Sequence, residues 1–446
     1  MVRVNKRRLG GWLPSDHKLL RKWHHKIIAR PVSSPHEYIE PIKNLQSLVA
    51  LSYELHASTQ AMFTEALVYD QDDPSGAPAV TSWLQFLGLL NNIMTTAPEF
   101  IVSKDGQAQG LVGFPINALL DWPMGTFAGY SVFSSDLFNR EFQKVLQYWG
   151  HFLTTEKSRY VLAEGEPDAD PPSIPWLGEQ ARQQMIAVAC QPENIPARAG
   201  SMTFTDIFQV PDRDDSRYLG FSSWDHFFVR EFQPDLRPVG DAPIVSACES
   251  APLQYQTHVK GSDRFWLKEQ PYSLMNMLNF DPLAEQFDGG SVYQAFLSAL
   301  SYHRWHSPVD GVIEKIVTVN GTYYLENISE GVYNTSSDPA APNASQPFTT
   351  SAASRAIFFI RANDPAIGLM AFVAVGMAEV SSNEATVKEG DEVKRGDQLG
   401  MFHFGGSTHC LVFRPSVSLK FHVPVTGQPN MDSINVAVNS NLATLA

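Results

Sequence analysis

The segment best suited to chemistry is Gly405-Gly406-Ser407-Thr408, which directly follows the strand-like stretch GMFHF. A glycine pair relaxes the steric limits on the backbone and permits strained φ and ψ angles. If a base removes its proton, the Ser407 hydroxyl can attack the Gly406 carbonyl and convert the peptide bond into an ester. β-Elimination would then cut the chain and leave dehydroalanine, which hydrolyses to a pyruvoyl group and ammonia. Most tetrapeptides of this kind are ordinary turns, so the motif by itself is weak.

Two histidines three positions apart, His303 and His306, form the second chemical feature. We expect them to lie near one another on a helical turn. Their spacing is compatible with a metal pair, a general base or packed core residues. No HExxH motif and no third ligand at short range accompany them, so a metal pair is the weakest of these. Imidazole titrates near neutral pH unaided, which makes a base for Ser407 chemically natural.

A carboxylate and a third histidine complete the set of candidates. Glu249 lies in the segment SACES (246–250), directly after two apolar residues. It could orient an imidazole, as a carboxylate does in a hydrolase triad. An ordinary carboxylate at the end of a strand is the simpler interpretation when its neighbours are ignored. His409 either lines a pocket near Ser407 or packs in the core.

The first half of the chain is expected to be helical and to be followed by a β domain. Apolar residues recur at helical spacing in four stretches, 37–68, 81–94, 135–153 and 177–189. From about residue 240, β-branched runs alternate with glycine turns; these runs are 311–324, 355–362, 367–380 and 384–404. The stretch 334–354 is rich in Ser, Ala and Pro, which predicts a mobile surface loop. The fold class is therefore predicted to be α+β, with a mostly antiparallel second part.

Composition excludes several classes of protein. The 446 residues are 43% hydrophobic and 18% charged, which is typical of globular chains. We find no run of eighteen apolar residues and no apolar segment after the basic start, so neither a membrane span nor a signal peptide is expected. Three cysteines cannot form a disulfide framework or a spaced zinc site, and the protein is expected to be cytoplasmic and reduced. They are Cys190, Cys248 and Cys410.

The net charge of −14 is unevenly distributed. Residues 1–30 carry nine basic groups and one acid, and the rest of the chain is strongly acidic. Such an acidic body disfavours nucleic acid as a partner. The basic start is compatible with a contact to an anionic membrane, a mitochondrial presequence or the solvated face of a first helix. We favour a helix that packs its apolar residues, among them Leu19, Trp23 and Ile27, on the helical domain.

Five segments in the right order resemble the phosphatidylserine decarboxylase family, whose members are pyruvoyl enzymes made by self-cleavage. The matching segments are 220–239, 244–250, 272–278, 301–311 and 400–408. The cleavage motif, usually Leu-Gly-Ser-Thr, is Gly405-Gly406-Ser407-Thr408 in this chain. The Tyr-His-x-x-His element is intact as Tyr302, His303 and His306. The triad aspartate of the family falls on Glu249, which keeps the carboxylate on a longer arm.

The resemblance implies a zymogen that cuts itself between Gly406 and Ser407 into two associated chains of 406 and 40 residues. It assigns His306 as the base for cleavage, oriented by Glu249, and His303 as the acid that protonates the carbanion. The cofactor would be a pyruvoyl group made from Ser407, without metal or pyridoxal phosphate. This group would form a Schiff base with the substrate amine and act as the electron sink. The remaining candidates, for the pocket, are Gly405, Thr408 and His409.

The helical first half is similar to the N-terminal region of a fungal branch of the family that has no membrane anchor. That branch implies a small-molecule substrate, an aromatic L-amino acid, with conversion of L-tryptophan to tryptamine in fungal secondary metabolism favoured. Decarboxylation of phosphatidylserine is the enzymatic alternative. A non-catalytic scaffold is the other, because residues 387–400 also resemble biotinyl and lipoyl barrels. The predicted regions are a basic segment 1–36, a helical region 37–200 and a catalytic domain 205–446.

Overall fold

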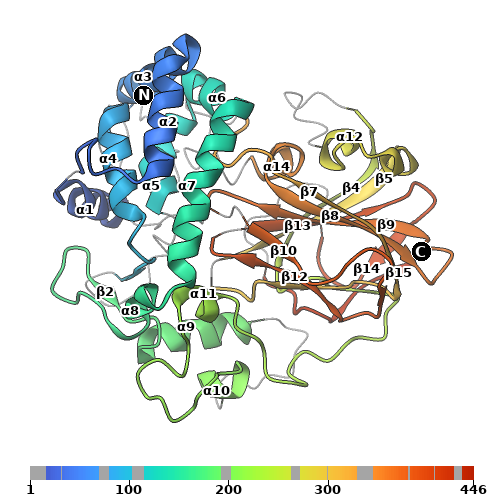
Figure 1. Cartoon of the computed structure of the whole chain (residues 1–446). Coiled ribbons are helices and arrows are strands. Elements are labelled where there is room, and N and C mark those ends of the chain that lie inside the picture. Colours follow the sequence, from blue (N-terminus) through green and yellow to red (C-terminus); the bar gives the residue numbers. More distant parts are fainter. Residues whose placement is uncertain are drawn as a thin grey trace, which may run out of the picture. The chain divides into compact units, whose positions relative to one another are not determined.

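The computed structural model contains two compact units, which draw on several separate parts of the chain (Figure 1). The described residues are 17–31, 33–69, 80–102, 115–191, 202–262, 272–298, 300–328, 345–379, 382–405, 407–425 and 434–446. The helical unit comprises Met1–Ala181, Asp215–Asp225 and Gly321–Gln346. The sheet unit comprises Arg182–Asp214, His226–Asn320 and Pro347–Ala446. The units interleave in sequence, and the boundary predicted near residues 200–205 remains a prediction.

The helices confirm all four stretches with helical spacing, with one difference. The principal helices are α1 (His17–Ile28), α2 (Glu40–Leu51), α3 (Tyr53–Tyr69), α4 (Trp83–Ile93), α5 (Pro115–Met124), α6 (Phe127–Phe133), α7 (Asp136–Thr154) and α9 (Glu179–Ala189). The stretch 37–68 forms two helices instead of one, because Ser52 is extended, with φ −102° and ψ 114°. The hydroxyl of Ser135 accepts a hydrogen bond from the Phe138 amide and so begins α7.

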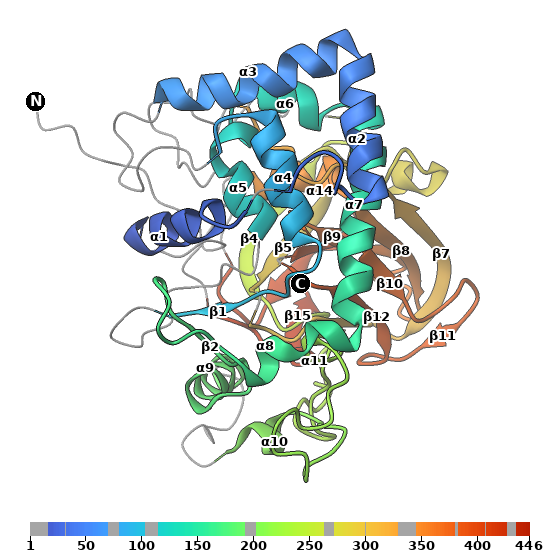
Figure 2. The same cartoon turned by 60° about the vertical axis from the view of Figure 1, so that its left-hand side comes forward.

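The core of the helical unit follows from the apolar faces of these helices. In α7, the buried positions Phe138, Phe142 and Trp149 recur at helical spacing. Figures 1 and 2 show α2 beside α7, and α2 buries Ile42 and Val49. In α1, the predicted apolar residues Leu19, Trp23 and Ile27 are all buried. The first helix therefore packs its apolar face inside the protein, as the favoured interpretation of the basic start expected. Among the described residues, none of the helices is both long and apolar enough to cross a membrane.

The sheet unit is antiparallel throughout, which confirms the predicted α+β class. Its main sheet has seven strands in the order β11-β7-β8-β9-β13-β5-β4, and two three-stranded sheets have the orders β10-β12-β6 and β14-β15-β3. The strands are β3 (Ile244–Val245), β4 (Ala251–Val259), β5 (Gly290–Leu297), β6 (Arg304–His306), β7 (Gly311–Val319), β8 (Arg355–Ala362), β9 (Leu369–Gly376), β10 (Ser382–Ala385), β11 (Glu392–Val393), β12 (Gln398–His403), β13 (Ser407–Phe413), β14 (Leu419–Phe421) and β15 (Asn441–Leu445).

Strand β13 lies inside the main sheet, between β9 and β5. All seven of its residues are buried, so both of its faces are covered. Because side chains alternate along a strand, Leu411 and Phe413 share one face, where they join Tyr293 and Phe372 in the hydrophobic core. We call this side of β13 the core face. Ser407 and His409 belong to it by alternation, whereas Thr408 lies on the opposite face.

Two local predictions were wrong. The segment around His303 and His306 is not a helical turn, because Arg304–His306 forms β6 and pairs with β12. This pairing turns Trp305 into the core, where it is fully buried. The stretch 334–354 is not a loop throughout, because Gln346–Ala352 forms the helix α14. Buried polar residues such as Thr350 lie in this helix, and residues 334–344 lie outside the described part of the chain.

Candidate active site

The chain crosses from one sheet to another immediately before Ser407. Strand β12 belongs to a three-stranded sheet, whereas β13, which begins at Ser407, belongs to the main sheet. In the crossing, Phe404 has a φ of 30° and Gly405 a φ of 114°. A bulky residue such as Phe404 rarely adopts a positive φ, and such strain persists only where the surrounding structure imposes it. Gly406 lies outside the described residues. The backbone leading to the predicted scissile bond is therefore strained.

The hydroxyl of Ser407 is buried and uncommitted. The residue is 0% exposed, and its Oγ has no hydrogen-bond partner among the described residues. Both ring nitrogens of His409, the next residue on the core face, are likewise buried without a partner. Buried polar groups usually have partners, and each exception calls for an explanation. A hydroxyl without a competing partner can turn toward the carbonyl that precedes it, as the predicted attack requires.

His306 is held in one tautomer by two contacts. Its Nδ1 lies 2.7 Å from the carbonyl oxygen of Gly396, and its Nε2 lies 3.0 Å from the hydroxyl of Tyr302. The carbonyl can only accept, so Nδ1 carries the proton and Nε2 accepts from Tyr302. Burial lowers the pKa of His306, and the bond to Gly396 opposes this change. The imidazole is therefore neutral near pH 7 and has a basic lone pair on Nε2.

His303 is a fully buried, neutral imidazole. Burial and the neighbouring Arg230 lower its pKa to about 3, and the backbone of Ser301 opposes this decrease. Its ring stacks on Phe228 at a centroid distance of 4.0 Å. The carbonyl oxygen of His303 accepts from the amide of Phe402 at 2.9 Å, near the crossing to Ser407.

The pairing of β6 with β12 separates the two histidines. His306 pairs with Gln398 at the first residue of β12, whereas His303 lies opposite the other end. Three residues of strand span about 10 Å, so His303 is at the Ser407 end of this ladder and His306 is at the far end.

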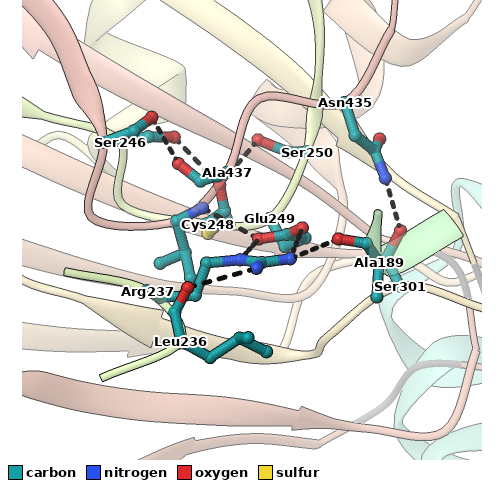
Figure 3. A network of polar contacts seen from close by, with 12 residues as sticks. Ala189, Leu236, Arg237, Ser246, Cys248, Glu249, Ser250, Ser301, Asn435 and Ala437 are labelled. Carbon is teal, nitrogen blue, oxygen red and sulfur yellow. Dashed lines mark hydrogen bonds and ion pairs between the residues drawn. The ribbon is translucent and has the colours of Figure 1, made fainter. Parts of the chain in front are cut away.

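Glu249 is bound by an arginine that sequence analysis did not select (Figure 3). Its Oε1 accepts from Nη2 of Arg237 at 2.7 Å, and its Oε2 accepts from Nε of Arg237 and from the amide of Val438, both at 2.9 Å. Both side chains are almost completely buried. Nη2 of Arg237 also donates to the carbonyl of Ala189 at 2.7 Å. Among the described residues, none of the hydrogen bonds of Glu249 reaches His306, so its role in orienting His306 remains a prediction.

A stack of side chains nevertheless connects Glu249 to His306. The guanidinium of Arg237 lies 4.1 Å from the centre of the Phe232 ring. Phe232 stacks on Tyr302 at 4.5 Å, and Tyr302 donates to His306. The amide of His306 also donates to the carbonyl of Ala247, two residues before Glu249, at 2.8 Å. Arg237 and Phe232 both belong to the segment 220–239, which is one of the segments that resemble the family. This resemblance is the feature of the sequence that could have pointed to them.

The other candidates occupy both faces of β13. His409 packs on the core face against Tyr293 and Phe372, and burial lowers its pKa to about 3. Thr408 points to the opposite face, where its hydroxyl donates to the carbonyl of Ala295. Within the described ranges, no group of three or more His, Cys, Asp or Glu residues gathers in a way that could hold a metal ion.

The two cysteines that neighbour candidate residues in the sequence, Cys248 and Cys410, are poor nucleophiles. Cys248 and Cys410 are both fully buried, and burial raises the pKa of each thiol well above its usual range. A thiol kept protonated in this way reacts slowly. Cys248 and Cys410 therefore offer no reactive thiolate, and Ser407 remains the predicted nucleophile.

Comparison with protein families assigns both halves of the chain. A family model described as phosphatidylserine decarboxylase matches residues 224–433, and a second with this description matches residues 39–185. The first of these ranges contains Glu249, His303, His306 and Ser407. The chain belongs to the phosphatidylserine decarboxylase family, and it is a decarboxylase.

Individual relatives narrow this class to a fungal branch. The decarboxylase iboD of Amanita muscaria is 40% identical over 348 residues, which cover 75% of this chain and 94% of that protein. The L-tryptophan decarboxylase of Psilocybe cubensis is 32% identical, over 91% of this chain and 88% of that protein. The phosphatidylserine decarboxylase proenzyme 3 of Schizosaccharomyces pombe is also 32% identical, but over 45% of this chain and 19% of that protein. The predicted resemblance to fungal decarboxylases is confirmed.

Proposed function

We propose that the protein is a self-cleaving, pyruvoyl-dependent decarboxylase of an aromatic L-amino acid, with L-tryptophan as the favoured substrate and tryptamine as the product. The observation that carries this proposal is the buried hydroxyl of Ser407, which has no hydrogen-bond partner among the described residues and follows the strained backbone of Phe404 by three positions. The family itself is pyruvoyl-dependent. The amino-acid substrate is supported by relatives named L-tryptophan decarboxylase, one of which matches 91% of this chain.

Maturation begins at Ser407. Its Oγ loses a proton to an imidazole and attacks the Gly406 carbonyl carbon, so the peptide C–N bond breaks as the ester C–O bond forms. Loss of the Ser407 α-proton then breaks the Cβ–O bond, which frees Gly406 as a carboxylate and leaves dehydroalanine. One water adds and one ammonia leaves, and residue 407 becomes the pyruvoyl group. The strain before Ser407 favours the first step, because breaking the peptide bond relieves it.

His306 is the proposed base for this cleavage. Its neutral state and the lone pair on Nε2 suit a proton acceptor. Glu249 is proposed to act on His306 through Arg237, Phe232 and Tyr302, because these side chains form a continuous stack. The register of β6 on β12 favours a second candidate, His303, which lies at the Ser407 end of the ladder.

During turnover, His303 is proposed to be the acid that passes a proton to the substrate carbon. When formed, the pyruvoyl group supplies a ketone that captures the substrate amine and withdraws electrons from the carbon that carries the carboxylate. The amine releases its proton to solvent before it reacts. After carbon dioxide leaves, His303 delivers one proton to that carbon and regains one from solvent, so that the imidazole is neutral again. Burial of Ser407 and His303 suits this reaction, because a carboxylate that leaves as neutral carbon dioxide is favoured by low polarity.

The two chains are proposed to stay associated in the cytoplasm after cleavage. The short chain would begin with β13, which pairs along its whole length with both β9 and β5. It would also contain β15, which pairs with β3 of the long chain. A strand with two neighbours cannot leave the sheet without breaking both ladders.

Mass spectrometry and an activity panel test the proposal together. The wild-type protein should yield a 40-residue chain that begins with a pyruvoyl group at position 407, whereas Ser407→Ala should remain one chain of 49.6 kDa without activity. Carbon dioxide release should be fastest with L-tryptophan among L-tryptophan, L-tyrosine, L-phenylalanine and phosphatidylserine vesicles. An active protein with an unbroken chain contradicts the mechanism. Activity on the vesicles alone contradicts the substrate class.

A further inference from the structure

Four buried side chains form a row of hydrogen bonds that ends beside Ser407. Nε2 of Gln254 donates to the hydroxyl of Tyr272 at 2.6 Å, and this hydroxyl donates to Oε1 of Gln294 at 2.6 Å. Nε2 of Gln294 then donates to Oγ1 of Thr408 at 3.0 Å. All four residues are at most 1% exposed. We call these residues the Thr408 network.

The hydrogen bonds of the Thr408 network all run in one direction. Each hydroxyl accepts from the preceding residue and donates to the next, and Thr408 donates to the backbone carbonyl of Ala295 in β5 at 2.9 Å. Bonds aligned in this way polarise one another and hold the side chains that they join. The bonds from Tyr272 to Thr408 are all made, whereas at the far end of the row Oε1 of Gln254 has no partner among the described residues. The network therefore fixes the Thr408 side chain against the neighbouring strand from which Gln294 also comes.

The network does not take part in the chemistry of the core face. Thr408 lies on the side of β13 opposite Ser407 and His409, and its neighbours in register are Phe296 and Val375. Its other members come from β4, from β5 and, in the case of Tyr272, from two residues before the helix α12 (Leu274–Met277). Among the contacts of the described residues, none joins the network to His303, His306 or Glu249. Its connection to Ser407 is the peptide bond between residues 407 and 408.

If the proposed maturation takes place, the peptide bond between residues 407 and 408 becomes the bond that holds the reactive group. Before cleavage, residue 407 is held on both sides, by Gly406 and by Thr408. After cleavage, the amide nitrogen of Thr408 is its single covalent attachment. The direction in which the new ketone points then depends on how firmly Thr408 is held. A displacement of about 1 Å at a reacting group can lower the rate by two orders of magnitude.

We infer that Thr408, Gln294 and Tyr272 are positioning residues that hold the reactive carbonyl of residue 407 after cleavage. This inference rests on the proposed function. It predicts a defect in turnover that is larger than the defect in maturation, because the intact chain still holds residue 407 from the Gly406 side. A network that only stabilised the fold would lower the amount of folded protein, but it would leave the kcat of each pyruvoyl group unchanged.

Four variants separate these possibilities. Thr408→Val removes the hydroxyl and keeps the shape, whereas Thr408→Ser keeps the hydroxyl. Tyr272→Phe breaks the row at two bonds, far from the scissile bond. Thr350→Val in α14 is the matched control, because it removes an equally buried hydroxyl that donates to a backbone carbonyl, that of Pro347. For each variant, the pyruvoyl content is measured by mass spectrometry, and kcat and KM with L-tryptophan are expressed per pyruvoyl group.

The expected result is a loss of kcat with an unchanged KM. Thr408→Val and Tyr272→Phe should lower kcat per pyruvoyl group by roughly tenfold or more with KM within about twofold, and Thr408→Ser and Thr350→Val should stay close to the wild type. Wild-type kcat in both Thr408→Val and Tyr272→Phe, or an equal loss in Thr350→Val, overturns the inference and leaves the proposed function standing. If Thr408→Val does not mature, Tyr272→Phe decides by the same criterion. A wild-type protein without a pyruvoyl group overturns the proposed function instead.

Discussion

The hydroxyl of Tyr302 lies 3.0 Å from Nε2 of His306 and occupies the ring nitrogen that a general base would use. Burial raises the pKa of Tyr302, so the phenol stays protonated and remains a donor. His306 is therefore neutral, and its Nε2 lone pair is occupied by Tyr302. If His306 is the base that we propose, proton transfer from Ser407 requires this hydroxyl to turn away or to pass the proton on.

Removal of the Tyr302 hydroxyl should expose the base. In Tyr302→Phe, Nε2 of His306 loses its donor, which frees its lone pair and favours its protonated form. We expect cleavage to become faster by roughly threefold to tenfold, the worth of one hydrogen bond. The measurement is the rate at which the short chain appears on a denaturing gel after synthesis. A slower rate would show that Tyr302 holds His306 in a productive position instead.

The two histidines should have separable roles. His306→Gln should prevent cleavage, because the proposed base is lost, and the chain should stay at 49.6 kDa. His303→Gln should mature, but its decarboxylation rate per pyruvoyl group should fall by roughly a hundredfold or more, a typical effect of removing an acid–base catalyst. The reverse pattern, with cleavage lost in His303→Gln alone, would assign the base to His303, as the β6–β12 register favours.

Loss of Arg237 should strongly destabilise the protein. Arg237→Met leaves the Glu249 carboxylate buried without its partner, and breaking a buried pair in this way costs about 3 kcal/mol or more. Thermal and urea unfolding measure the loss. The double variant Arg237→Met, Glu249→Gln should recover more than half of it, because the unpaired charge is gone. The exposed pair Lys144–Glu141 is the control, and Lys144→Ala should change stability by less than about 1 kcal/mol. Equal stability of the single and double variants would contradict coupling between Arg237 and Glu249.

The protein should lose stability between pH 6.5 and pH 4. Burial lowers the pKa of both His303 and His409 from 6.5 to about 3, so in this range the unfolded chain binds protons that the folded chain does not. Stability therefore rises with pH across the window and is lost on acidification. Each histidine should account for about 2 kcal/mol at pH 5. Urea titrations at pH 7 and pH 5 measure this. His409→Leu should reduce the difference by about 2 kcal/mol, and an unchanged difference would contradict its buried neutral state.

Periodicity alone predicted the elements that pack in a regular way. The run 355–362 is β8 without any shift in its bounds, because its apolar and β-branched residues fit the middle of a covered sheet. The stretch 135–153 became α7 for the corresponding reason in a helix. The prediction for the segment around Trp305 was wrong, because three residues are too few to show a hydrophobic period. Pairing with β12 determined their conformation instead.

The candidate site also contains features that the sequence could predict and features that depend on tertiary contacts. The positive φ of Gly405 was predictable, because a glycine pair after a strand marks a backbone that needs unusual angles, whereas the positive φ of Phe404 was not. The stack from Arg237 through Phe232 to Tyr302 was not, because it depends on segments that meet only after folding. The Thr408 network could not be predicted for the same reason, since its residues are spread over more than 150 positions from Gln254 to Thr408.

The positive φ of Phe404 lies where the chain passes from β12 to β13, which belong to different sheets. Because such a conformation persists only where the surrounding structure imposes it, we expect this bend to form once both sheets are in place. A nascent or misfolded polypeptide lacks that bend and therefore lacks the strain that favours the proposed cleavage. If the chain cuts itself as we propose, the number of bands on a gel would report on folding: molecules with the native architecture would run as two pieces, and those without it would run as one.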